Sequence, residues 1–245
     1  MVHSYVKVPT VDDWWSLTSR YPHHRKFSLT PLKDYGYMEL FQILEATRAV
    51  RVLEFGHGLN INEELNLFDR FKDRELWGVD DDQGVAYFKS GAEWTAEYET
   101  KILKRFPWVK FERALLGTLH GRSATLPEAY FDVVCSVSVL EELPLERIPP
   151  VLDHAFRLLR PGGLFVNSHD IRLGDSHRYR EIVRLQREAG FALDGGDVEP
   201  GNWDATFLLL ENPIGVMLYY QGAQPEDRRF MGNFATMMMV AQKLA

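Results

Sequence analysis

Five short apolar segments alternate with amphipathic helical segments along the middle of the chain, and this alternation limits the fold more than any other feature. The expected strands are residues 51–55, 76–79, 109–115, 131–139 and 164–168. The expected helices lie within residues 61–71, 84–106, 145–159 and 176–190. Such alternation predicts a parallel sheet with helices on both faces. The segment 131–139 is apolar or small throughout, as a strand buried on both faces should be.

The two ends of the chain differ from this pattern. Near the C-terminus, two apolar runs, 216–221 and 234–242, flank a polar loop and predict a hairpin. Residues 1–49 are rich in aromatic side chains and interrupted by prolines, which indicates a helical cap. We therefore expect an α/β fold with a doubly wound, mostly parallel, seven-stranded Rossmann-like sheet. An antiparallel C-terminal hairpin strand and an N-terminal helical extension complete a single domain over residues 1–245, with its core at 50–245.

Composition excludes several classes of protein. A chain of 245 residues suits one domain. The formal net charge of -7 argues against a nucleic-acid partner, because proteins that bind a phosphate backbone are usually basic. No apolar run reaches the ~18 residues of a membrane span, and the N-terminus lacks the core of a signal peptide. The single cysteine, Cys135, lies in an apolar run and cannot form a disulfide within the chain. We expect a cytoplasmic protein without a membrane partner.

A glycine turn, EFGHG at residues 54–58, follows the first expected strand. Ligands of open parallel sheets bind beyond the carboxyl ends of the strands. Gly58 would let the backbone pass close to such a ligand, and Asp80, at the end of the second strand, could accept both hydroxyls of a ribose. The sequence therefore predicts a nucleoside site. Ile61 stands where a dinucleotide fingerprint requires its third glycine, which disfavours a nicotinamide oxidoreductase without removing that alternative.

Four segments in order, VLEFGHGLN, LWGVDDD, FDVVCSVSVLEELP and LLRPGGLFVNS, resemble the motifs of class I S-adenosylmethionine-dependent methyltransferases. The resemblance covers roughly residues 50–170. It implies S-adenosylmethionine as the cofactor, and it agrees with a sheet that ends in one antiparallel strand. The positions that it assigns to the cofactor are Glu54, Gly56, Gly58, Asn60, Asp80, Asp81, Leu116, Ser136 and Ser138.

The resemblance also implies a role for each group. Glu54 would orient the amino acid end of the cofactor, the two glycines would line its methionine part, and Asp80 would bind the ribose. Asp81 would flank the adenine, the backbone at residue 115 or 116 could substitute for a missing acidic partner of the adenine, and the two serines would touch the methionine part or the substrate. Two departures stand out: Asn60 replaces the third glycine of the motif, and no acidic residue follows the third strand. They motivate an alternative, a non-catalytic methyltransferase-like binding protein or partner subunit.

Four polar residues near the carboxyl ends of the fourth and fifth strands are candidates for a catalytic base: Glu141, Glu142, His169 and Asp170. His169 directly follows the expected fifth strand, so we expect it at the rim of the site, where its ordinary pKa suits a base at neutral pH. Glu141 is the second choice, and no spread of metal ligands is evident, so no metal is expected. We expect methyl transfer to a small-molecule acceptor, on oxygen rather than nitrogen, and leave open whether the chain forms a homodimer.

Overall fold

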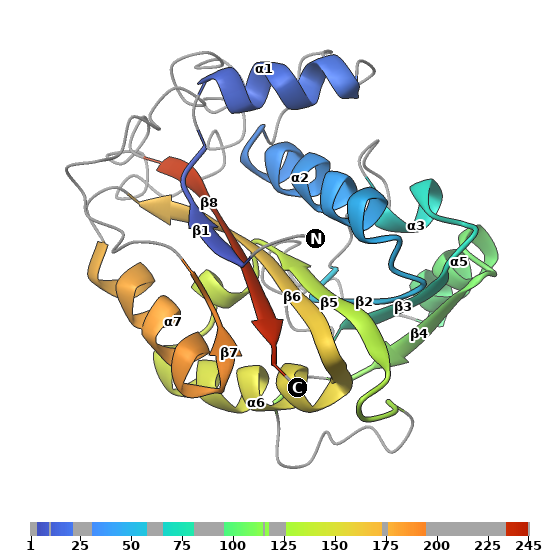
Figure 1. The fold of residues 1–245 in the computed structure, drawn as a ribbon. Helices are drawn as coiled ribbons and strands as arrows, with labels where there is room; N and C mark the ends of the chain where they lie inside the picture. The colour runs from blue at the N-terminus through green and yellow to red at the C-terminus, as the bar shows by residue number, and fades with distance from the viewer. Residues whose placement is uncertain are drawn as a thin grey trace, which may run out of the picture.

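The computed structural model describes residues 4–9, 11–21, 31–57, 66–80, 96–114, 116–117, 126–172, 176–194 and 234–244. Within these ranges one sheet has the order β1-β8-β6-β5-β2-β3-β4, with β7 also paired to β8 (Figure 1). Its strands are β1 (Tyr5–Lys7), β2 (Arg51–Phe55), β3 (Glu75–Asp80), β4 (Val109–Arg113), β5 (Phe131–Val137), β6 (Leu159–Arg172), β7 (Phe191–Ala192) and β8 (Phe234–Lys243).

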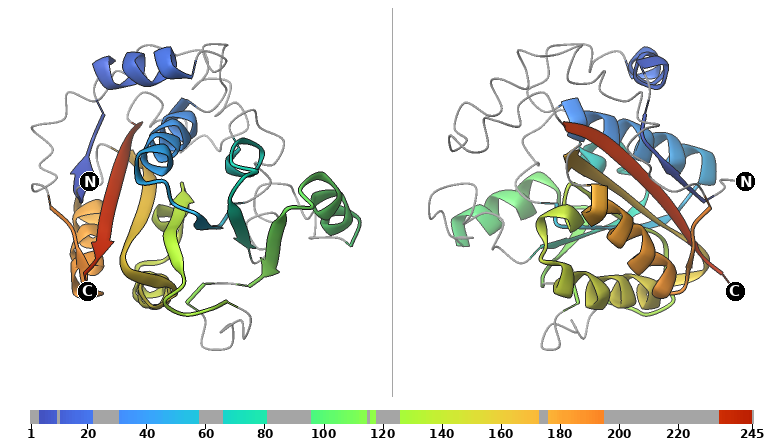
Figure 2. Two further views of the ribbon diagram at one scale, coloured as in Figure 1. Left: turned by 45° about the vertical axis from the view of Figure 1, so that its right-hand side comes forward. Right: turned by 90° about the vertical axis from the view of Figure 1, so that its left-hand side faces the viewer.

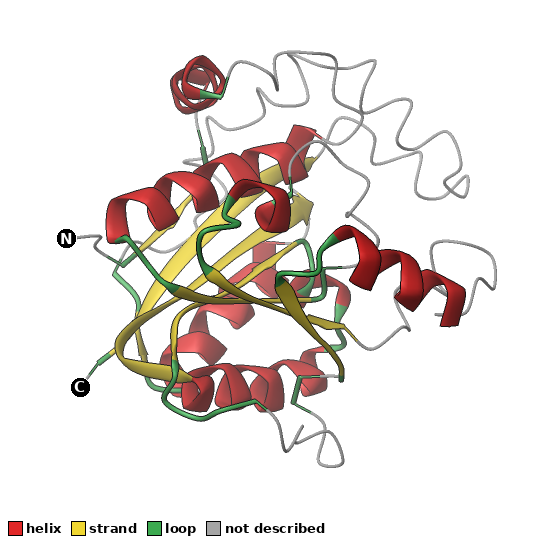
Figure 3. Cartoon of the chain, turned by 90° about the vertical axis from the view of Figure 1, so that its right-hand side faces the viewer, coloured by secondary structure: helices red, strands yellow, loops and turns green. Residues whose placement is uncertain are grey.

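Helices cover both faces of the sheet (Figure 3). One face carries α1 (Val11–Arg20), α2 (Pro31–Thr47), α3 (Leu67–Arg70) and α5 (Ala96–Arg105). The other carries α6 (Ile148–Leu158) and α7 (Ser176–Glu188), preceded by the short 3-10 turns η3 (Leu140–Glu142) and η4 (Leu145–Arg147). None of the helices in the described ranges is long and apolar enough to cross a membrane.

The predicted fold class is confirmed, although the sheet has eight strands in the described ranges where we expected seven. Strands β2 to β6 pair in parallel, and β8 lies antiparallel to β6, as expected for the last strand of the fold. Strand β5 is buried along almost its whole length between β2 and β6. The expected strand 216–221, the other half of the predicted hairpin, lies outside the described residues, as do residues 61–65 and 84–95.

The N-terminal segment contributes a strand where we expected only helices. Strand β1 pairs with β8 and continues the outer edge that β7 begins (Figure 2). The amide of Val6 donates to the carbonyl of Asp194, next to β7, and the hydroxyl of Tyr5 donates to Glu39 on α2 at 2.5 Å. Contacts with residues far along the chain therefore define this three-residue strand. They also cover part of an edge that would otherwise leave backbone groups unpaired.

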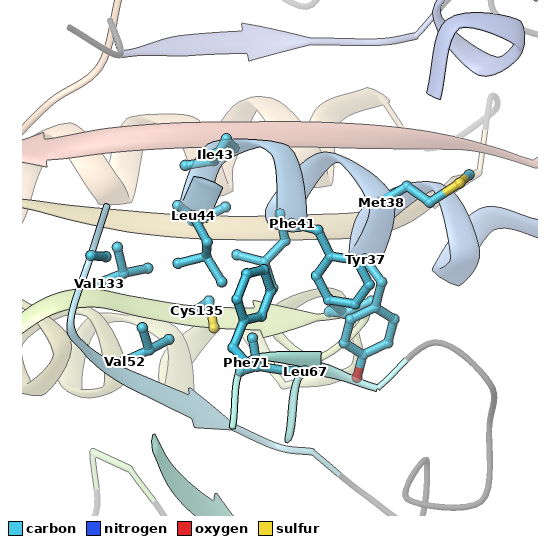
Figure 4. Close-up of a cluster of buried hydrophobic side chains, with 14 of the residues drawn as sticks. Tyr37, Met38, Phe41, Ile43, Leu44, Val52, Leu67, Phe71, Val133 and Cys135 are labelled. Atoms are coloured by element: carbon cyan, nitrogen blue, oxygen red, sulfur yellow. The ribbon is translucent and has the colours of Figure 1, made fainter. Parts of the chain in front are cut away.

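A buried apolar cluster fixes α2 on the sheet (Figure 4). Phe41 and Leu44 of α2 reach toward Val52 of β2 and Val133 of β5, and all four side chains are buried. Cys135 belongs to the same cluster, as predicted, and burial raises the pKa of its thiol. Because α2 is anchored in this way, the side chain of Tyr37 has a fixed position against the end of β2, where it contacts Glu54.

The close approach of α2 to β6 depends on Gly36. A Cβ at this position would lie 2.4 Å from Oγ and 3.0 Å from Cβ of Ser168. Helix propensity alone would favour Gly36→Ala by about 1 kcal/mol, whereas overpacking costs about 1–3 kcal/mol. We therefore expect Gly36→Ala to lower the free energy of unfolding, measured in urea. Adding Ser168→Gly should restore most of the loss, and a Gly36→Ala variant more stable than the wild type would contradict this packing.

Candidate active site

The glycine turn and Asp80 lie side by side at the carboxyl ends of β2 and β3. The amide of Gly56 donates to the carbonyl of Val79 at 2.8 Å, so the turn continues directly from the pairing of the two strands. The carbonyl of Asp80 accepts from the amide of Ala114 at 2.9 Å, which ties the end of β3 to the segment after β4. Glu54 and Asp80 are both buried. Two carboxyl groups therefore flank the turn, as a cationic ligand requires.

Glu54 is held from above by α2. The hydroxyl of Tyr37 donates to Oε1 of Glu54 at 2.7 Å, and both side chains are buried. Burial raises the pKa of Glu54 to about 7; the charge of Asp80 adds to this shift, and the hydrogen bond from Tyr37 opposes it. The acidic residue of the turn is thus oriented by the protein before any ligand is bound.

The raised pKa of Glu54 makes stability depend on pH. In the unfolded chain this carboxyl ionises near pH 4.3, whereas in the folded chain it keeps its proton to about pH 7. Between these values the folded state binds more protons, so stability falls as pH rises and levels off above about pH 7, with a total loss on the order of 3 kcal/mol. Glu54→Gln keeps an acceptor for Tyr37 and should remove this part of the loss. Urea unfolding of both proteins from pH 4.5 to 8 measures the difference; equal pH dependence would contradict it.

The segment after β5 packs against the glycine turn. Gly56 has a φ of 64°, and a Cβ there would lie 2.6 Å from Cγ2 of Val139, so only glycine fits this turn. Ser138 also has a positive φ, 55°, and its amide donates to the carbonyl of Ser168 at 3.0 Å. The hydroxyl of Ser136 is buried and has no hydrogen-bond partner among the described residues. The ends of β2, β5 and β6 therefore converge around this turn.

The segment after β4, predicted to face the adenine, packs on α6. The side chain of Leu116 is buried in the core on the α6 side. The amide of Gly117 donates to Nδ1 of His154 at 3.4 Å, and a Cβ on this glycine would meet the backbone of Val151 at 2.4 Å. The side chain of Leu116 thus has a packing role. Its proposed role toward the adenine concerns its backbone only.

The expectation that His169 faces the rim of the site is wrong. Strand β6 does not end at Ser168 but continues to Arg172, because β8 pairs with it over that whole length. The side chain of His169 is fully buried. Its Nδ1 lies 3.1 Å from Oε2 of Glu141, and its Nε2 lies 2.6 Å from Oδ1 of Asn167. The two residues chosen as catalytic therefore contact each other in the interior.

This buried pair belongs to a network that joins η3, β6 and α7. The other oxygen of Glu141, Oε1, accepts from the amide of Asp170 at 2.8 Å, and the Glu141 carbonyl accepts from Nε of Arg178 at 3.1 Å. The side chain of Gln186 donates to Oδ1 of Asn167 at 3.1 Å. Buried polar groups that are paired in this way order their neighbours. Glu141 therefore positions the backbone of Asp170.

We expect His169→Ala to affect stability first. The change removes one partner from each of two buried oxygens, Oε2 of Glu141 and Oδ1 of Asn167. This costs about 1–3 kcal/mol in the free energy of unfolding. His177→Ala, at an exposed histidine of α7, is the matched control and should change stability by less than about 0.5 kcal/mol. Urea unfolding of both variants measures this. A His169→Ala protein with full stability and no activity would restore the catalytic role.

Asp170, another of the candidate bases, differs from His169 in the face of the sheet that its side chain takes. It lies next to His169 on β6, so its side chain points to the opposite face of the sheet. The side chain is half-buried, and the backbone carbonyl accepts from the hydroxyl of Tyr179 at 3.2 Å. Burial raises the pKa of the Asp170 carboxyl to about 7; the charge of Glu141 adds to the shift, while Lys33 and Ser138 oppose it. A carboxyl with such a pKa can accept a proton near neutral pH.

Three of the predicted cofactor residues, Gly58, Asn60 and Asp81, lie outside the described residues. Two side chains that the structure brings to the site were not predicted to act there. They are Tyr37, which contacts Glu54, and His57, which is buried inside the glycine turn. The helical spacing of Tyr37, Leu40, Phe41 and Leu44 indicates a buried helix face, but nothing in the sequence indicates which carboxyl Tyr37 contacts.

Comparison with known families agrees with this arrangement. The sequence model of a protein family described as "Methyltransferase domain" matches residues 65–167. The match begins after the glycine turn and includes β3, β5 and the first part of β6, which carry the other three motifs.

Solved structures with related folds are distant in sequence. StiE O-MT residues 961–1257 are similar at 14% identity, over 84% of this chain and 71% of that chain, with a TM-score of 0.53. Phosphoethanolamine N-methyltransferase 2 of Haemonchus contortus, in complex with phosphomonomethylethanolamine and S-adenosylhomocysteine, matches at 14% identity and a TM-score of 0.50. The match covers 80% of this chain and 49% of that chain. The [4+2]-cyclase SpnF is also similar, at 17% identity over 85% and 81% of the two chains, with a TM-score of 0.48. At these identities the likeness concerns the fold.

The residues of the site fit the cofactor that the sequence motifs imply. Gly56 keeps the turn free of a side chain, two buried carboxyls suit a ligand with a sulfonium and an ammonium, and Asp80 ends the strand beside the turn. The strand order, the motifs and the family match agree with one another. The predicted resemblance to class I S-adenosylmethionine-dependent methyltransferases is thereby confirmed: residues 65–167 match the model of a methyltransferase domain, and the residues of the site fit S-adenosylmethionine as the cofactor.

Proposed function

We propose that the protein transfers a methyl group from S-adenosylmethionine to an oxygen of a small-molecule acceptor, with Asp170 as the proton acceptor. One observation carries this proposal: at the carboxyl end of β6, Asp170 has a half-buried carboxyl on the face opposite His169, its backbone is held by Glu141, and burial raises the pKa of the carboxyl. A hydroxyl must lose its proton as it attacks the methyl group, and a base of this pKa can take that proton at neutral pH.

The negative charge around Asp170 supports oxygen over nitrogen. The charges of Glu141 and Glu142 both act on this carboxyl. Such surroundings favour the protonated form of an amine, which has no free electron pair for attack. A neutral hydroxyl does not meet this obstacle. The similar structures include both StiE O-MT and a phosphoethanolamine N-methyltransferase, so the choice of oxygen depends on the residues of this chain.

The cofactor supplies an electrophilic methyl group on a positively charged sulfur. We assign its ribose to Asp80 and its amino acid end to Glu54, which Tyr37 orients. Gly56 would let the backbone approach the methionine part. The roles of the remaining positions, Gly58, Asn60, Asp81, Leu116, Ser136 and Ser138, are carried over from the family motifs.

When bound, the cofactor would supply an electrophilic methyl group: the acceptor oxygen would form a bond to the methyl carbon as the bond from that carbon to sulfur breaks, and the electron pair would stay on sulfur. Asp170 would take the proton of the acceptor hydroxyl. The protein's contribution is to hold the acceptor in line with the methyl group. Glu141 fixes the backbone of Asp170 for this purpose.

A panel of paired acceptors tests the proposal. Each small phenol or alcohol is assayed beside the amine of the same shape, with S-adenosylmethionine carrying a labelled methyl group. We expect label to enter hydroxyl compounds and not their amine counterparts. Label in amines alone would overturn the choice of oxygen. Binding of S-adenosylhomocysteine without transfer to any acceptor would favour a non-catalytic methyltransferase-like protein.

A further inference from the structure

A buried histidine lies inside the glycine turn. His57 directly follows Gly56 and is 2% exposed. Its ring meets the edge or face of two aromatic rings, Phe68 at 5.8 Å and Phe111 at 5.4 Å between centroids. These contacts fix the plane of the imidazole, because the two rings come from α3 and from the sheet strand β4, and both lie in the same apolar cluster on one side of the sheet.

One ring nitrogen of His57 is directed toward the carboxyl assigned to the ribose. Nδ1 lies 4.0 Å from Oδ2 of Asp80, and Asp80 itself is 7% exposed. The distance exceeds that of a hydrogen bond. The histidine therefore acts on Asp80 by limiting the orientation of its side chain.

Asp80 also faces a like charge. Its carboxylate acts on Glu54 of the neighbouring strand, and this repulsion contributes to the raised pKa of Glu54. A carboxylate removed from water requires favourable partners. The imidazole adjoins this carboxyl and, held between two aromatic rings, limits the positions that the carboxyl can take.

We propose that His57 is a positioning residue that holds the Asp80 carboxylate for the cofactor's ribose. The inference rests on the role proposed for Asp80. It assigns a function to the residue between the two glycines of the turn, His57, whose side chain is buried and does not face solvent. His57 does not need to touch the cofactor itself.

A double-mutant cycle with S-adenosylhomocysteine tests the inference by calorimetric titration. His57→Phe keeps a ring against Phe68 and Phe111 and removes the nitrogen, and we expect it to weaken binding roughly tenfold. In the Asp80→Asn background the same change should alter affinity by less than about twofold. His57→Asn, which retains a nitrogen near the position of Nδ1, should recover most of the affinity.

Thermal unfolding of each variant shows whether it is folded before it is titrated. Equal losses from His57→Phe in both backgrounds, or wild-type affinity of His57→Phe, would overturn this inference while the proposed role of Asp80 stands. If the folded wild-type protein does not bind S-adenosylhomocysteine, the proposed function fails and this inference fails with it.

Discussion

Replacing Asp80 with alanine should weaken binding of S-adenosylmethionine by about 1.5–3 kcal/mol, the cost of losing hydrogen bonds to a charged group. Asp80 is buried at the end of β3 and adjoins the glycine turn. Glu54 also lies beside the turn, but Tyr37 already donates a hydrogen bond to it, so we do not expect Glu54 to replace Asp80 as the partner of the ribose. Calorimetric titration of the variant measures the loss.

The matched control is Asp69→Ala, which removes a half-exposed carboxyl of α3 that pairs with Arg105. We expect this control to bind the cofactor as the wild type does. If Asp80→Ala also binds with unchanged affinity, the ribose is held elsewhere and the assignment of Asp80 is wrong.

Asp170→Asn should lower kcat by about 10²–10⁴-fold with the best hydroxyl acceptor, because an amide cannot accept the proton. The KM for S-adenosylmethionine should change little, since Asp170 lies on β6 and the proposed cofactor residues Glu54 and Asp80 end β2 and β3. The pH profile is a second measurement. The wild-type kcat should rise through about pH 7, where the Asp170 carboxyl ionises, and the variant should lose this rise.

Asp153→Asn serves as the control for Asp170→Asn, because this carboxyl of α6 is exposed and pairs only locally with Arg157 among the contacts of the described residues. It should keep the wild-type kcat. An Asp170→Asn protein that retains kcat within about twofold, with the same pH profile, would contradict the role of this carboxyl as proton acceptor.

Much of the fold was predictable because the parallel strands are buried. The run of apolar residues from Phe131 indicated a central strand, and the structure places β5 between two others. The ends of such strands locate the glycine turn and Asp80 at one edge of the sheet, so these two features were predicted to be neighbours. Gly190, with a φ of 94°, follows α7 close to the end of the expected helix, and a glycine in this conformation commonly ends a helix.

The features that were not predicted depend on contacts across the fold. Strand β1 has three residues and no pattern of its own; β8 defines it. The length of β6 is likewise set by β8, and the added residues turn His169 into the interior and Asp170 to the other face. The bond from Tyr37 to Glu54 joins residues 17 apart, on α2 and β2. No local pattern encodes which partner a buried polar side chain meets.

The most direct test of the central claim is calorimetric titration of the folded protein with S-adenosylmethionine and with S-adenosylhomocysteine. The arrangement of Glu54, Gly56 and Asp80 predicts that both bind with micromolar dissociation constants. If a well-folded sample binds neither compound, the glycine turn does not hold this cofactor in the protein, and the account of the site is contradicted.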